Sequence, residues 1–242
     1  RRFFLAAGAA LAAAPETGEQ PLLLFRPAEA ERMRRPTAGT KPILEALRAH
    51  ATSAMNNGPW SVTFAGPRSP SGEPNDYWSD APYWWPDPKN PKGPYIRRDG
   101  ERNPERFVQH HDDLGRLGQA VLSLGAAAWL FGERKCAERA RLLLRTWFLD
   151  SKTRMNPHLE YAQALRGHNS GRGAGIIDAR PLIAVVQGMK FLEGSGLWSE
   201  TERKAVQEWY AAFLKWLTES EKGKAERKAG NNHTNWWTAQ VA

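Results

Sequence analysis

Apolar side chains recur every three or four residues through much of the chain, which is the spacing of amphipathic helices. A helix is predicted from Asp112 to Phe131, where Gly132 provides a C-terminal stop, and residues 134–149 follow as its hairpin partner. A third helix is predicted from Asp178, as its N-cap, to about Glu193. Pro181 is tolerated in the first turn of that helix.

Two more helices complete the pattern. Ser199 and Glu202 have the spacing of a capping box, and the apolar residues that follow them share one helix face. Residues 41–57 show the same periodicity and end at Gly58 and Pro59. No segment alternates as a strand does, so the sequence predicts an all-α chain of antiparallel helix hairpins.

Two long stretches, residues 59–104 and 150–177, interrupt the helices. The first is rich in proline and glycine but also dense in aromatic residues, whereas disordered segments are poor in them. Ordered loops of this length are usually functional. Long loops between successive hairpins suggest an incomplete (α/α) toroid, or barrel, whose cleft the loops line.

Composition divides the chain of 242 residues, 41% of them hydrophobic, into three parts. Residues 1–14 combine Arg1 and Arg2 with an alanine-rich run and are predicted to be a twin-arginine-type export signal, too short to span a membrane. Residues 15–40 are predicted as a linker and 41–242 as the main domain. The expected location is periplasmic or secreted. The single cysteine, Cys136, permits no internal disulfide.

The net charge of +8 favours a polyanionic partner. Basic residues are spread among acidic ones without a basic run, which argues against nucleic acid. An exported protein more often meets an acidic polysaccharide. His110, His111, His158 and His168 lack a compact ligand spacing, so neither a metal nor a cofactor is predicted. The oligomeric state is left open.

The segment 230–237 carries the strongest candidate chemistry, with amides, an imidazole and two indoles in eight residues. Asparagines suit a helix start, where free N–H groups and the helix dipole favour an anion. A helix beginning near Asn232 would aim its amides at a carboxylate, with His233 beside them to move a proton. The alternative is an asparagine cap followed by a buried histidine and tryptophan pair.

Three separated motifs resemble the alginate lyase superfamily. They are DYWSDAPYWWPDP at 76–88, continued by PYIRRDG at 94–100 and NPE at 103–105, then GRGAGIID at 171–178, and finally Asn231-Asn232-His233. The resemblance covers about residues 59–242. It implies an incomplete (α/α) toroid that cleaves a uronate polysaccharide, alginate or a related polyuronate, by β-elimination.

Elimination removes a proton from C5 of a uronic acid, next to a carboxylate whose charge must be neutralised. The family pattern gives this role to Asn232, with His233 assisting as base or as neutraliser. The superfamily's tyrosine base and a nearby arginine are expected beyond Ala242. The chain is therefore expected to be an N-terminal fragment of the domain.

Other residues are candidates for substrate binding. Arg172 would pair a substrate carboxylate, cap a helix end or bind Asp178. Aromatic faces would stack on sugars, although at least one of the paired tryptophans is expected to anchor its loop. Tyr77 is expected on a mobile lid. The full set is Tyr77, Tyr83, Trp84, Trp85, His168, Arg172 and Trp236.

Two other functions fit the composition. A glycoside hydrolase on the same fold needs two facing carboxylates, and Asp80, Asp87, Asp99, Asp112 and Asp113 are available. A non-catalytic binder of acidic glycans would use the aromatic and basic residues but would not depend on His233.

Overall fold

The computed structural model describes residues 31–64, 66 and 69–242. The predicted export signal at 1–14 lies outside these residues, as does the linker up to residue 30. Helices make up more than half of the described residues, which confirms the predicted all-α class in its broad form.

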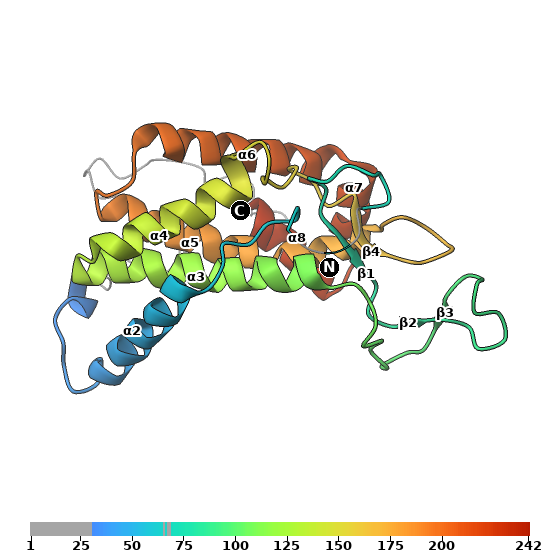
Figure 1. Cartoon of the computed structure of the whole chain (residues 1–242), viewed down its shortest axis with the longest axis horizontal. Coiled ribbons are helices and arrows are strands. Elements are labelled where there is room, and N and C mark those ends of the chain that lie inside the picture. The colour runs from blue at the N-terminus through green and yellow to red at the C-terminus, as the bar shows by residue number, and fades with distance from the viewer. Residues whose placement is uncertain (1–30, 65, 67–68) are drawn as a thin grey trace, which may run out of the picture.

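The helices lie side by side in one body, with the strands gathered at one end (Figure 1). The α-helices are α2 (Lys41–Asn56), α3 (Gln109–Phe131), α4 (Arg134–Leu144), α5 (Pro181–Gly194), α6 (Glu200–Glu219), α7 (Glu221–Arg227) and α8 (Asn232–Val241). A π-helical turn, η1 (Arg145–Leu149), continues α4, and a 3-10 helix, η2 (Gly173–Ala179), precedes α5.

Most predicted helix ends are confirmed by their local geometry. Gly132 adopts the left-handed conformation at the end of α3, with φ 68°. The Ser199 side chain accepts a hydrogen bond from the backbone N–H of Glu202 at the start of α6. The prediction that Asp178 caps α5 is wrong, because Asp178 is buried inside η2 and α5 begins at Pro181.

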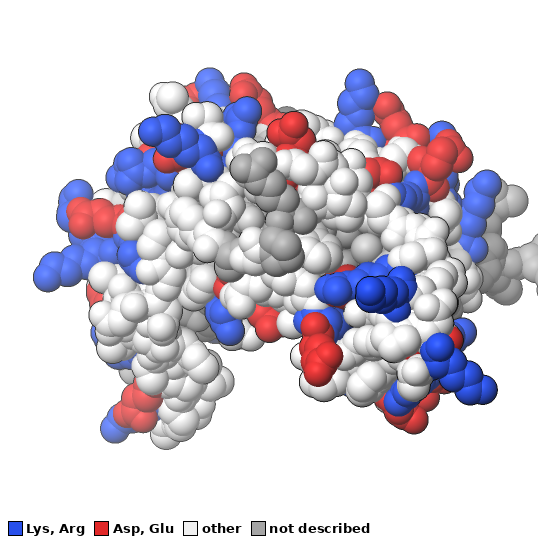
Figure 2. Space-filling view, turned by 45° about the vertical axis from the view of Figure 1, so that its right-hand side comes forward, with Lys and Arg blue, Asp and Glu red and all other residues white. Residues whose placement is uncertain are grey.

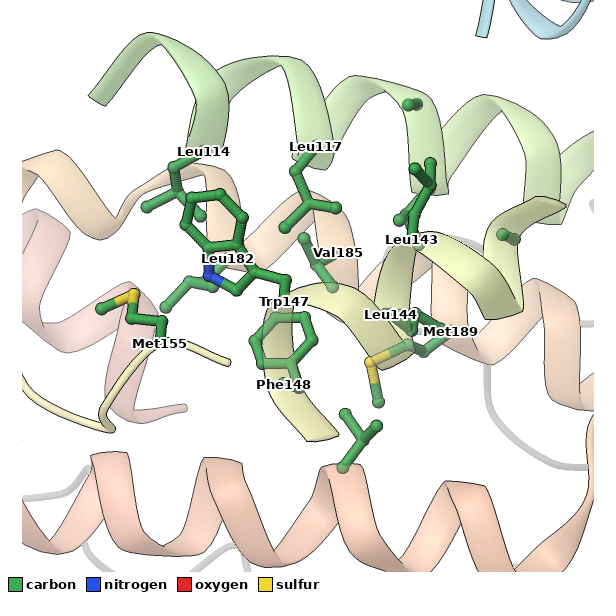
Figure 3. Close-up of a cluster of buried hydrophobic side chains, with 14 of the residues drawn as sticks. Leu114, Leu117, Leu143, Leu144, Trp147, Phe148, Met155, Leu182, Val185 and Met189 are labelled. Carbon is green, nitrogen blue, oxygen red and sulfur yellow. The ribbon is translucent and has the colours of Figure 1, made fainter. Parts of the chain in front are cut away.

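The core is built around α3, which packs most extensively against α5 and also contacts α4 and α2. Figure 3 shows side chains from α3, η1 and α5 pointing toward one another. Leu117, Trp147 and Val185 have no exposed surface in this cluster. At about 25 cal/mol for each Å² of buried apolar surface, such side chains hold the helices together.

Glycines allow α3 and α5 to approach closely. A Cβ added at Gly118 would lie 2.8 Å from the carbonyl oxygen of Pro181, and one added at Gly188 would lie 2.5 Å from that of Val121. Real Cβ atoms do not come this close, so the α3–α5 contact requires glycine, which has no side chain, at both positions.

Four short strands correct the expectation that the chain contains none. β1 (Trp78–Asp80) pairs in parallel with β4 (Tyr161–Ala164). β2 (Trp84–Trp85) pairs in antiparallel fashion with β3 (Ile96–Arg97). The β1–β4 pairing ties together the two long loops seen in the sequence, so segments far apart in the chain meet at one end of the helices.

Among the described residues, α3 is the one helix long and apolar enough to cross a membrane. However, 56% of its most apolar stretch is buried inside the protein. Core helices commonly have this composition, and the packing of α3 is that of a core helix.

Gly125→Ala is expected to destabilise the fold by about 1–3 kcal/mol, because its methyl group would overpack the α3–α5 contact. An added Cβ there would lie less than 3.0 Å from the Gly188 carbonyl oxygen. The matched control is Gly115→Ala on the same helix, where no atom lies within 4 Å of the added Cβ. This control is expected to stabilise α3 by up to about 1 kcal/mol. Urea unfolding measures both, and equal effects would contradict the close-contact argument.

Candidate active site

A cavity of about 350 Å³ lies at the strand end of the helices, where the three sequence motifs meet. It is lined by β1 and the loop after it, the start of α3, β4, η2 and the start of α8. The lining residues are Ser79, Asp80, Pro82, Tyr83, Arg102, Arg106, Val108, His111, Gln163, Arg172, Ile177, Asp178, Arg180, Asn232 and His233. Among the predicted site residues, Tyr83, Arg172, Asn232 and His233 are thus brought together.

The carboxylate of Asp178 organises the floor of this cavity. Its Oδ2 accepts hydrogen bonds from the Tyr77 hydroxyl at 3.0 Å and the Ser79 hydroxyl at 2.6 Å. Its Oδ1 accepts from Nε2 of Gln163 at 2.9 Å. A buried carboxylate requires such donors. Asp178 therefore ties η2 to both strands of the β1–β4 pair.

Gln163 connects this network to Arg172. Its backbone has φ 49°, in the left-handed region that residues other than glycine rarely adopt. The Ser79 hydroxyl accepts from its backbone N–H at 2.9 Å, and its Oε1 accepts from Nη2 of Arg172 at 2.8 Å. Bonds to backbone and side chain together hold this strained residue, as strained residues at functional sites usually require.

The glycine-rich motif lets η2 pack tightly and so places Arg172. A Cβ added at Gly173 would lie 2.9 Å from the carbonyl oxygen of Lys222 on α7. A Cβ added at Gly175 would collide with the backbone of Ala162 on β4. The arginine next to these contacts is held near α7 and β4, facing the cavity.

Arg172 is a partly buried cation that forms no direct ion pair with another described residue. Burial lowers the pKa of its guanidinium, while the charges of Asp178 and Glu226 oppose that shift. Its Nε has no hydrogen-bond partner within the described part of the chain. Of the three roles predicted for Arg172, the direct bond to Asp178 is replaced by an indirect one through Gln163. Arg172 therefore brings a positive charge to the cavity lining.

Helix α8 presents Asn232 and His233 at its N-terminus, as the sequence predicts. The helix is capped by Asn231, whose Oδ1 accepts from the backbone N–H of His233 at 2.8 Å. Asn232 is exposed and His233 is partly buried. The His233 Nδ1 lies 2.6 Å from Oε1 of Glu226 on α7, a residue that sequence reasoning missed.

The acidic side chains that line the cavity are already paired. Asp80 accepts from Nη2 of Arg166 at 2.6 Å and from the backbone N–H of Phe107 at 2.9 Å. Asp178 is occupied by its three donors. Neither carboxylate is free to face a ligand.

Several arginines line the cavity with their charge uncompensated by these carboxylates. Arg106 donates to the backbone carbonyl of Asn103 and Arg180 to that of Ile177. Arg102 is exposed. On the face that Figure 2 shows, Lys and Arg side chains are interspersed with Asp and Glu. The cavity lining itself combines several arginines with carboxylates that are already paired, which suits an anion.

Tyr77 does not take the role predicted for it. Its side chain is 0% exposed and its hydroxyl donates to Asp178, so it offers no face to a sugar and lies on no lid. The buried apolar ring instead fixes the segment that leads into β1. Tyr83 keeps its predicted position, lining the cavity.

The remaining aromatic candidates lie outside the cavity lining. Trp85 donates from Nε1 to the carbonyl of Glu101 at 2.9 Å, which is the anchoring role expected for one of the pair. Trp84 and His168 form an edge-to-face contact at 4.9 Å between ring centres. Trp236 is exposed on α8, with the Arg180 guanidinium 5.1 Å from its ring. Trp84 and His168 therefore contact each other outside the cavity lining, and Trp236 contacts Arg180, which lines it.

The residues that sequence reasoning missed are mostly polar partners rather than motif residues. They are Ser79, Arg102, Arg106, Gln163, Arg180 and Glu226, and His111, which was considered only as a metal ligand. Asp178 was assigned to a helix cap. No cluster of three or more metal-ligating side chains occurs in the described ranges.

Comparisons with known proteins show the family of this chain and a similar solved structure. A protein-family model described as alginate lyase matches residues 61–242. The solved structure of an alginate lyase from Bacteroides ovatus is similar, with a TM-score of 0.81 and 37% sequence identity. The match covers 88% of this chain and 56% of that one, so the chain spans little more than half of that protein's length. A search of curated proteins found no match.

Tyr77→Phe is expected to lower the free energy of unfolding by about 1–3 kcal/mol at neutral pH, because Asp178 loses a donor. Burial, followed by the charge of Asp178, raises the pKa of Tyr77 well above its ordinary value. The folded state therefore binds the phenol proton more tightly than the unfolded chain. The contribution of the Tyr77 hydroxyl to the free energy of unfolding is complete below the pKa that Tyr77 has in the unfolded chain. It is lost as the pH rises toward the higher pKa of the folded state.

Urea unfolding at neutral and alkaline pH tests this, and the Tyr77→Phe variant should lose stability less steeply than the wild type above about pH 10, the ordinary pKa of tyrosine. Tyr161→Phe serves as the matched control, since Tyr161 is only partly buried. A Tyr77→Phe variant with unchanged stability but weakened ligand binding would show instead that Tyr77 reaches the ligand.

Proposed function

The chain belongs to the alginate lyase family, and from this premise we propose that its cavity binds a uronate polysaccharide, alginate or a related polyuronate, and supports cleavage by β-elimination. The observation that carries the proposal is the meeting of Arg172, Asn232 and His233 in one cavity whose carboxylates are already paired. The similar Bacteroides ovatus structure, described as an alginate lyase, supports the same chemistry.

In this reaction a base takes the proton from C5 of the uronate. The electron pair left at C5 forms a double bond to C4, the C4–O glycosidic bond breaks, and the leaving oxygen takes up a proton. Negative charge grows into the uronate carboxyl group during proton removal, so donors aimed at that group stabilise the transition state. Asn232 and Arg172 supply such donors, and His233 assists as base or as neutraliser.

Aromatic residues at and near the cavity suit the sugars on either side of the cleaved bond. Tyr83 lines the cavity, and the next residue, Trp84 on β2, contacts His168 from the loop after β4. Flat apolar rings of this kind complement the C–H faces of sugars, while the exposed arginines attract the carboxylate that each uronate carries. We extend the proposal to an incomplete (α/α) toroid and to export through the twin-arginine-type signal.

A glycoside hydrolase is less well supported by the same site. Hydrolysis needs two carboxyl groups facing the scissile bond, one to donate a proton and one to act as nucleophile or base. Asp80 is held by Arg166, and Asp178 is buried beneath Tyr77 and Ser79. Neither carboxyl group of the cavity is placed for these roles.

His233→Ala is expected to abolish turnover, because the variant loses the imidazole beside the reacting carbon. The assay incubates the full-length protein with alginate, polymannuronate, polyguluronate or glucuronan. It follows the ultraviolet absorbance of the unsaturated product. His50→Ala, at an exposed histidine outside this cavity, is the control and should retain activity. Binding of a polyuronate without any absorbance change, in wild-type protein, would show a glycan-binding protein instead.

Arg172→Lys is expected to lower kcat/KM by about 10- to 100-fold, which corresponds to the roughly 1.5–3 kcal/mol of a hydrogen bond to a charged group. Lysine keeps the charge but loses the planar fork that matches a carboxylate. Arg134→Lys on the surface of α4 is the control. Steady-state kinetics on the best polymer decides, and unchanged kinetics would show that Arg172 serves only to hold Gln163.

A further inference from the structure

Glu226 is a buried carboxylate that contacts the imidazole of His233. Its side chain is only 3% exposed, and its Oε1 lies 2.6 Å from Nδ1 of His233. The two residues belong to different helices, α7 and α8, separated by a turn. Buried carboxylates are rare unless paired, so this contact is a defined feature of the site.

Hydrogen bonds hold both of the helices that carry the pair. The Ser220 side chain caps α7 by accepting from the backbone N–H of Gly223 at 3.0 Å. Asn231 caps α8, and the Thr234 hydroxyl donates to the backbone carbonyl of Glu226 at 3.4 Å. The side chains of Glu226 and His233 therefore meet on a rigid frame, as a positioned catalytic group requires.

The contact determines which ring nitrogen of His233 is free. A carboxylate only accepts hydrogen bonds, so Nδ1 carries the proton that it donates to Glu226. Nε2 is then the nitrogen left for a ligand, and in the neutral ring it holds a lone pair. This is the arrangement in which a carboxylate orients an imidazole as a general base.

The charge of Glu226 separates the two roles open to His233. An imidazolium paired with Glu226 would have its charge offset by that carboxylate and would be a weak partner for a substrate anion. A neutral imidazole loses nothing by the pairing and gains a fixed orientation. When it takes a proton, Glu226 stabilises the imidazolium that forms.

We propose that Glu226 is a positioning residue that assigns His233 the role of general base through Nε2 and leaves neutralisation of the uronate carboxylate to Asn232 and Arg172. The tyrosine that the superfamily uses as base and acid would then serve as the acid that protonates the leaving oxygen. This inference rests on the proposed lyase function. It names a role for a residue of α7 outside the three sequence motifs.

The groups that face Glu226 are His233 from α8 and Arg172 from the start of η2. Burial raises the pKa of Glu226, while the hydrogen bond and charge of His233 and the charge of Arg172 oppose the rise. A protonated Glu226 would donate to Nδ1 and move the ring proton to Nε2, which removes the base. Turnover is therefore expected to fall as the pH decreases through the range in which the pair gains a proton.

The test compares the wild type with Glu226→Gln, which removes the charge at nearly constant shape. We expect kcat to fall by about 100-fold, within the usual range for general base catalysis, with KM little changed. The acidic limb of the kcat profile should move to lower pH, because the imidazolium loses its carboxylate partner. Glu221→Gln, at an exposed position on the same helix, is the control and should match the wild type.

A second readout needs no substrate. Nitrogen-15 spectra of labelled histidine, with the His233 signals identified by His233→Ala, report which ring nitrogen carries the proton. In the neutral ring we expect the Nδ1–H form in the wild type and a smaller share of it in Glu226→Gln, because the glutamine amide can either accept from Nδ1–H or donate to Nδ1. Glu226→Asp keeps a carboxylate and should restore part of kcat and the Nδ1–H form. Circular dichroism establishes that each variant is folded.

The two readouts separate the two proposals. An Nε2–H form in the wild type, or wild-type kcat in folded Glu226→Gln, overturns the role of Glu226 while the lyase activity stands. If Glu226→Gln does not fold, the wild-type tautomer and the Glu226→Asp kinetics decide in the same way. Absence of product from every polyuronate overturns the lyase function itself, whatever the tautomer.

Discussion

The arrangement of the cavity depends on the hydrogen bonds that the carboxylate of Asp178 accepts. It lies near the end of η2 and receives hydrogen bonds from Tyr77, Ser79 and Gln163, which belong to two loops far apart in the sequence. A buried charge with three donors is stable, whereas one that loses a donor retains its full desolvation cost. The same network holds Gln163 in a strained conformation, and Gln163 in turn binds Arg172. The position of Arg172 therefore depends on Asp178, although the two side chains are connected only through Gln163.

This arrangement controls the charge that the cavity presents. Asp80 is paired with Arg166, and Asp178 accepts from neutral donors, so neither carboxylate is free to face a ligand. Arginines on the rim instead donate to backbone carbonyls, which leaves their charge unopposed. A polymer with one carboxylate on each sugar would meet positive charge at several successive positions. The net charge of the whole chain indicates such a partner only in general terms, whereas the pairing of individual carboxylates locates it.

The sequence predicted those features that are local and periodic. Helices α3 and α6 follow from three- and four-residue spacing and from their end residues, Gly132 and Ser199. The strands were missed because segments of two to four residues carry no alternation, and α7 was missed because seven residues are too few for a helical pattern. Tyr77 and Asp178 were misassigned for one reason: a buried hydrogen bond between distant residues leaves no local signal. The motifs thus identified the cavity, but not the polar partners that hold its residues in place.

The proposed mechanism places proton transfer and charge neutralisation on different elements, which has a physical advantage. A group that neutralises a carboxylate must stay cationic or donate hydrogen bonds, whereas a base must be unprotonated, and one imidazole cannot do both in the same step. Arg172 beside η2 keeps its charge despite burial because guanidinium is so basic, and Asn232 donates without any charge at all. His233, one residue further along α8, is instead bound to an anion on α7. In that mechanism Glu226 would stabilise the imidazolium of His233 as it forms, while Arg172 would stabilise the charge that grows into the uronate carboxyl group. Opposite fields at the two ends of the transferred proton lower the barrier in a way that neither would alone.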